Sequence, residues 1–216
     1  MNNQSNSWVA NHLNEFLGVC PKDYQYVVIG SVALISYTQK INYFRQIHDI
    51  DVICQAEGFT RIANELLNIG YEQSTFINKS MPFYKALMRL VNSKYYRFEK
   101  EGRALELMTT EFKKSQGSVC IELYPGLRFW FPESFVTTTN LNGVSFRAAS
   151  PEALYCIYSV GFTTWGKVVR AKNSQVLEDL KNLKKVVDMK LLRETASKVR
   201  IEVGKLSFKL PLMLIG

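Results

Sequence analysis

Residues 26–37 read YVVIGSVALISY and residues 48–54 read HDIDVIC, and these two stretches carry the clearest indication of the fold. The first opens with β-branched and aromatic residues, which predict a buried strand over 24–29. Gly30-Ser31 ends that strand, and an apolar helical pattern follows directly. The two stretches therefore predict a strand, a glycine turn, a helix and a second strand, which is an α/β beginning.

The second stretch alternates between acidic and apolar residues. In a strand this alternation places Asp49 and Asp51 on one face and Ile50 and Val52 on the other. Two such carboxylates lie about 6–7 Å apart along the chain and can converge on a divalent cation. An acid pair can also be a solvated sheet face. The apolar neighbours favour a buried strand, where paired acids are costly unless a cation meets them.

Gly30-Ser31 has the residue types of a phosphate seat. Glycine lets the backbone approach a ligand closely, and the helix that follows offers free N–H groups and a positive dipole end. A phosphate seat beside a metal-binding acid pair is the equipment for phosphoryl or nucleotidyl transfer.

The rest of the chain divides into a mixed part and a helical part. Ser150-Pro151-Glu152 has the composition of a helix start, so we predict an α/β core over 1–149 and a helical subdomain with an apolar tail over 150–216. The further helices predicted from periodicity cover 7–18, 58–70, 153–162, 175–188 and 190–198. The further strands predicted cover 83–91, 95–99, 104–109 and 118–124, with a hairpin around 140–143.

Composition limits the classes of protein to consider. The 216 residues are 47% hydrophobic, which excludes a disordered or fibrous chain. With 27 Lys+Arg against 19 Asp+Glu the net charge is +8, which suits an anionic partner or serves solubility alone. No apolar run reaches the length of a bilayer span and no signal peptide is visible. Four dispersed cysteines without a Cys-x-x-Cys pair predict reduced core thiols, so we expect a cytoplasmic protein without membrane contact.

The two opening stretches resemble the nucleotidyltransferase superfamily with the DNA polymerase beta-type fold, in particular its minimal, antibiotic-modifying and antitoxin-partner branches. The resemblance implies a mixed sheet with flanking helices and a C-terminal helical subdomain, an α/β (α+β) fold. It implies that Gly30 and Ser31 hold the triphosphate of an NTP donor. Asp49 and Asp51 would bind two Mg²⁺ ions.

The same resemblance implies a third acid on a later strand, which helps to activate the attacking hydroxyl. We prefer Glu122 for this role, within Cys120-Ile121-Glu122-Leu123, and keep Glu106 as its rival. Arg45 stands where family members often carry an arginine before the acid pair. Lys172 lies in a stretch that is similar to the family's Arg-x-Lys-Asp element, and both cations would contact the nucleotide.

We therefore expect Mg²⁺-dependent transfer of a nucleoside monophosphate from an NTP to a hydroxyl or phosphate acceptor, which could be a small molecule, RNA or a partner protein. One alternative is a non-catalytic module of the same fold that binds nucleotide, RNA or a partner. Another is an unrelated basic RNA-binding protein. Residues 95–98 interleave aromatic and cationic side chains, as single-strand binders do, but we interpret them as an amphipathic edge strand.

Overall fold

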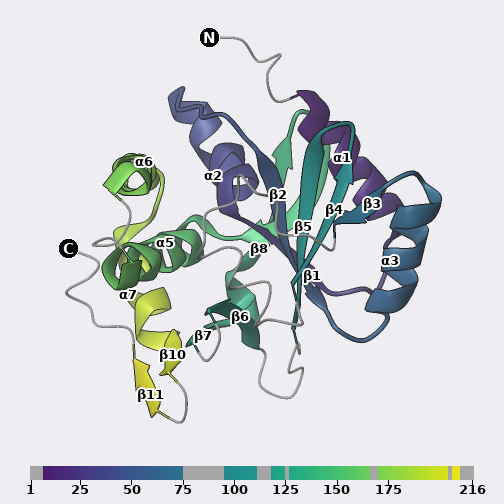
Figure 1. The fold of residues 1–216 in the computed structure, drawn as a ribbon. Coiled ribbons are helices and arrows are strands. Elements are labelled where there is room, and N and C mark those ends of the chain that lie inside the picture. Colours follow the sequence, from purple (N-terminus) through teal and green to yellow (C-terminus); the bar gives the residue numbers. More distant parts are fainter. Residues whose placement is uncertain are drawn as a thin grey trace.

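The computed structural model describes the chain over six stretches, residues 7–74, 95–110, 118–124, 127–165, 170–203 and 206–209. The strand predicted over 83–91 lies outside the described residues. Figure 1 shows a large twisted sheet with helices on both of its sides and a smaller sheet beside the C-terminal helices. The α/β class is confirmed.

The large sheet has seven strands in the order β3-β4-β5-β2-β1-β9-β8. β2 pairs in parallel with β5 and β1 pairs in parallel with β9, whereas the other neighbours are antiparallel, so the sheet is mixed. The bounds of its strands are β1 (Tyr26–Ile29), β2 (Asp49–Gln55), β3 (Glu72–Ser74), β4 (Tyr95–Lys100), β5 (Arg103–Thr110), β8 (Val136–Leu141) and β9 (Val144–Ala149).

Helices cover the two faces of this sheet. α1 (Ser7–Val19) packs against α3 (Phe59–Asn68), and α2 (Gly30–Thr38) lies across β1, β2 and β8 on the other side (Figure 1). Consecutive residues of β1, Val27 and Val28, are both fully buried, which requires cover on both faces. A 3-10 turn, η2 (Gln39–Ile41), extends α2 before the chain returns to β2.

The smaller sheet joins the middle and the end of the chain. Its order is β11-β10-β7-β6, and all three pairings are antiparallel. The bounds are β6 (Ser118–Tyr124), β7 (Leu127–Pro132), β10 (Arg200–Val203) and β11 (Leu206–Lys209). The described part of the predicted apolar tail forms the two strands β10 and β11. The division of the chain at residue 149 stays a prediction.

The C-terminal helices follow the large sheet. After the 3-10 turn η4 (Glu133–Phe135) and the β8–β9 hairpin come α5 (Pro151–Trp165), α6 (Arg170–Leu183) and α7 (Met189–Lys198). The Ser150 hydroxyl accepts the Ala153 N–H, as the predicted helix start requires. Asp188 caps α7 by accepting the N–H groups of Lys190 and Leu191. α5 and α6 both contact α2, so the helical part lies directly against the glycine-turn helix.

The core lies under the central strands. Ile50, Ile53, Phe98 and Leu105 are fully buried, and burial of each such side chain contributes about 1.5–3 kcal/mol. All four cysteines are free thiols, as predicted. None of the helices among the described residues combines the length and the apolar character that crossing a bilayer would require.

Candidate functional site

The acid pair lies at the start of β2. Asp49 and Asp51 are half-buried, whereas Ile50 and Val52 between and after them are fully buried, so the predicted alternation is confirmed. β1 runs antiparallel to β2 and places Ile29 opposite Asp51. This pairing brings the glycine turn, which follows Ile29 directly, to the acid pair.

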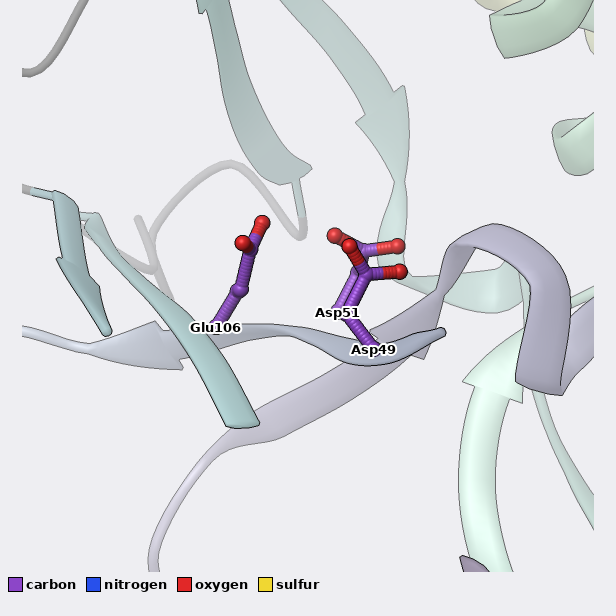
Figure 2. A group of neighbouring side chains, drawn as sticks. All are labelled: Asp49, Asp51 and Glu106. Carbon is purple, nitrogen blue, oxygen red and sulfur yellow. The ribbon is translucent and has the colours of Figure 1, made fainter. Parts of the chain in front are cut away.

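A third carboxylate joins this pair from the strand on the other side of β2. Glu106 lies on β5, in register with Asp51, and is buried at 2% exposure. One carboxylate oxygen from each of Asp49, Asp51 and Glu106 lies within 4.8 Å of the other two. Figure 2 shows the three carboxyl groups projecting from the same side of the two strands.

Two residues of β4 hold the carboxylate of Glu106. The Arg97 guanidinium donates to Oε1 at 2.5 Å, and the Tyr95 hydroxyl donates to Oε2. Arg97 also donates through Nε to Glu99. Partial burial alone would lower the pKa of Arg97, but its hydrogen bonds to Glu99 and Glu106 and their charges raise that pKa above its ordinary value.

Gly30 lies directly against the carboxylate of Asp51. Its φ is +67°, in the left-handed region, and a Cβ placed there would lie 2.0 Å from Oδ2 of Asp51. Only glycine therefore allows the first residue of α2 to sit against this carboxylate. Ser31 follows and is buried. The helix predicted after the turn begins at Gly30 itself, so its N-terminal end lies beside the acids.

The two cations predicted to contact the nucleotide are Arg45 and Lys172. Arg45 donates at 2.5 Å to Asp179 of α6, a fully buried carboxylate that also accepts from the Tyr43 hydroxyl at 2.7 Å. Lys172 belongs to α6, but its side chain lies outside the described part of the structure. Nucleotide contact by either residue stays a prediction, as does the triphosphate contact of Gly30 and Ser31.

The structure brings Glu106 to the acid pair and leaves the preferred third acid, Glu122, untested. Glu122 lies on β6 in the smaller sheet, and its side chain is outside the described part, so its role is not tested. Glu106, the rival, occupies the position because β5 is the parallel neighbour of β2. A missing third acid would favour the non-catalytic alternative, but Glu106 supplies a third acid beside the pair.

Arg97 and Tyr95 are the residues that the sequence reasoning missed. Residues 95–98 were interpreted as an edge strand, and that interpretation was wrong, because β4 pairs with β3 on one side and β5 on the other. The available signal was the two-residue spacing of Tyr95 and Arg97, which places both side chains on one face of a strand.

The donor set fits a divalent cation with a preference for oxygen. Three carboxylates that share one space suit Mg²⁺ or Mn²⁺, which take carboxylates, water and phosphate oxygens. The adjacent N-terminal end of α2 is a favourable place for an anion. The arrangement can hold a metal ion and a phosphate group side by side.

The fold is that of nucleotidyltransferases. The lincosamide antibiotic adenylyltransferase LnuA, in its lincomycin-bound crystal structure, matches 87% of this chain and 99% of its own, with a TM-score of 0.55 and 18% identity. ANT(2'')-Ia in complex with adenylyl-2''-tobramycin matches 88% of this chain and 95% of its own, with a TM-score of 0.58 and 11% identity. The solution structure of ANT(2'')-Ia, described as an antibiotic-resistance factor, gives 0.57 at 12% identity, covering 88% of this chain and 90% of its own.

No family model matches the sequence, and no curated protein matches it either. At these identities the structural likeness shows the fold alone, and it confirms the fold that the opening stretches predicted.

Proposed function

We propose that this protein is a nucleotidyltransferase that moves a nucleoside monophosphate from an NTP to a hydroxyl or phosphate acceptor and releases pyrophosphate. The observation that supports the proposal is the convergence of Asp49, Asp51 and Glu106 within 4.8 Å, beside a glycine that opens a helix. The acids come from the neighbouring strands β2 and β5, and the glycine turn follows β1, the other neighbour of β2. The likeness of this fold to that of nucleotidyltransferases adds support to the proposal.

The proposed ligands of Mg²⁺ are Asp49, Asp51 and Glu106. The resemblance to the nucleotidyltransferase superfamily implies two such ions. Bound Mg²⁺ supplies positive charge to the triphosphate and to the attacking oxygen. We assign the third carboxylate to Glu106 rather than Glu122, because Glu106 is in register with Asp51 on the neighbouring strand. The carboxylates also orient an acceptor hydroxyl and can take its proton.

The N-terminal end of α2 is the proposed triphosphate seat. Gly30 leaves no side chain between the helix end and Asp51, so a phosphate can approach the backbone N–H groups next to the acids. The protein then acts mainly by positioning the donor and acceptor, which is where most catalysis of phosphoryl transfer lies.

Small hydroxyl compounds are the first acceptors to test. LnuA is described as a lincosamide antibiotic adenylyltransferase, and ANT(2'')-Ia was solved with adenylyl-2''-tobramycin. We propose that this chain also modifies a small molecule, with RNA and a partner protein as the other acceptor classes to be compared with it.

The test is incubation with each α-labelled NTP and Mg²⁺ in the presence of lincosamides, aminoglycosides, RNA or protein. We expect label transfer and pyrophosphate release with one acceptor class, and a loss of at least about a hundredfold in Asp51→Asn, because the loss of a metal ligand weakens charge stabilisation in the transition state. Glu57→Gln is the matched control, since Glu57 is an exposed acid just beyond β2.

Two results would contradict the proposal. NTP binding without transfer to any acceptor would favour the non-catalytic module. RNA binding that weakens steeply with salt and survives Asp49→Ala and Asp51→Ala would favour the basic RNA-binding protein.

A further inference from the structure

Glu106 is held by residues that belong to neither the acid cluster nor the glycine turn. We infer that Arg97 and Tyr95 are positioning residues of the metal site, which fix the carboxylate of Glu106 in the orientation that meets Asp49 and Asp51. This inference rests on the proposed function, because it assigns the residues that support that same site.

The strand register makes the contact to Glu106 direct. Arg97 stands opposite Glu106 in the antiparallel pairing of β4 and β5, and Tyr95 precedes it by two residues on the same face. Arg97 contacts Oε1 and Tyr95 contacts Oε2. Because each donor takes a different oxygen, together they fix both the position and the plane of the carboxylate. A carboxylate oxygen carries two lone pairs, so accepting one hydrogen bond does not prevent it from binding a metal ion.

Two carboxylates, those of Glu99 and Glu106, hold the side chain of Arg97 in place. Its Nε donates to Glu99 while another nitrogen of the guanidinium donates to Glu106, so the side chain spans two carboxylates on two strands. Arginine suits this place because its planar fork offers several donors in fixed directions. The chain of contacts runs from the half-exposed Glu99 through Arg97 to the buried Glu106.

Charge balance also supports a positioning role for Arg97. Three carboxylates with oxygens within 4.8 Å repel one another, and a buried carboxylate without a cationic partner is costly. Arg97 supplies positive charge from the side of Glu106 and so reduces the repulsion within the cluster. The arginine therefore helps to hold Glu106 beside the two aspartates.

A purely structural ion pair and a positioning pair predict different results. A structural pair changes the free energy of unfolding and leaves metal affinity alone. A positioning pair changes metal affinity, typically by about 10–100-fold for partners that orient a ligand.

The experiment is a Mn²⁺ titration of the whole chain, followed by the electron paramagnetic resonance signal of free Mn²⁺. We expect Arg97→Met to weaken Mn²⁺ binding by about tenfold or more. Tyr95→Phe, which removes one hydrogen bond and little volume, should weaken it by about fivefold. Arg97→Lys keeps the charge and should recover part of the affinity. Lys100→Met is the matched control, because it removes a β4 cation that pairs with Glu15.

The possible outcomes separate the two proposals. Wild-type protein that binds no Mn²⁺ would overturn the proposed function and this inference with it. Wild-type binding that stays within about twofold in both Arg97→Met and Tyr95→Phe would overturn the inference and leave the proposed function standing. If Arg97→Met fails to fold, Tyr95→Phe decides the question. In an active assay the same variants should raise the Mg²⁺ concentration for half-maximal rate, with kcat recovering at saturating Mg²⁺.

Discussion

Gly30 is the residue where backbone conformation and chemistry depend on each other most closely. Its positive φ strains any residue that carries a side chain, and a Cβ placed there would lie 2.0 Å from Asp51 Oδ2, so that this carboxylate would have to move. Gly102 has nearly the same φ, +70°, but a Cβ there would meet nothing within 4 Å. The two glycines therefore separate the cost of backbone strain from the cost of the contact with Asp51.

We predict that Gly30→Ala destabilises the fold and weakens Mn²⁺ binding, because Asp51 must move to make room for the methyl group. The strain alone costs of order 1–3 kcal/mol, and Gly102→Ala should show that cost without a change in metal affinity. Urea unfolding and Mn²⁺ titration measure the two effects. Equal metal affinity in the two variants would contradict the close approach of Asp51 to α2.

The polar cluster around Asp179 connects elements on the two sides of the predicted division. Arg45 and Tyr43 precede β2, and Asp179 and Gln175 lie on α6. Gln175 donates both to the Tyr43 hydroxyl and to Asp179. The segment that leads into the acid pair is thus tied to the helical part by an ion pair whose carboxylate is fully buried.

We predict that Arg45→Met lowers the free energy of unfolding by about 3 kcal/mol, the low end for breaking a buried pair, since Arg45 is 23% exposed. Tyr43→Phe should cost about 1 kcal/mol. Lys198→Met removes an exposed pair with Glu194 and a contact over the Phe135 ring, and should cost less than about 1 kcal/mol. Urea unfolding distinguishes them. Unchanged stability in Arg45→Met would favour the role on the nucleotide that the resemblance implies.

The same elements show how far sequence reasoning reaches. Local alternation placed Asp49 and Asp51 on one face of β2, and Gly30-Ser31 marked the start of α2, because both patterns act over a few residues. The choice between Glu106 and Glu122 depends on which strand lies beside β2. Both acids stand in alternating apolar strands, so no local pattern separates β5 in the large sheet from β6 in the small one.

The partners of Arg97 and Arg45 were out of reach for the same reason. Arg97 contacts Glu106 because β4 pairs with β5, which places the two residues opposite each other. Arg45 meets Asp179, which is far away in the sequence and lies on a helix whose packing no local pattern specifies. Pairing between distant segments is what the sequence leaves open.

Buried thiols and a buried phenol make the stability of the protein depend on pH in the alkaline range. Burial raises the pKa of Cys54 and of Cys156 from 9.0 to about 12, and that of Cys20 to about 12. Burial also raises the pKa of Tyr24, with smaller contributions from Cys54 and Cys20. These groups ionise first in the unfolded chain, so above their ordinary pKa the folded state binds more protons than the unfolded state.

We predict that stability falls as pH rises from about 9 toward 12, because the unfolded state gains from releasing protons that the folded state retains. The measurement is the urea midpoint at a series of pH values above neutrality. Cys156→Ala removes one such group and should give a shallower fall, whatever it costs at neutral pH. A midpoint that stays constant up to about pH 11 would contradict the burial of these thiols.

The Mn²⁺ affinity of Glu106→Gln compared with that of Glu122→Gln tests most directly whether Asp49, Asp51 and Glu106 form one divalent-metal site beside the start of α2. Such a site predicts that Glu106→Gln and Asp51→Asn each weaken Mn²⁺ binding at least about tenfold, while Glu122→Gln binds like the wild type. Loss of binding in Glu122→Gln with wild-type affinity in Glu106→Gln would contradict it.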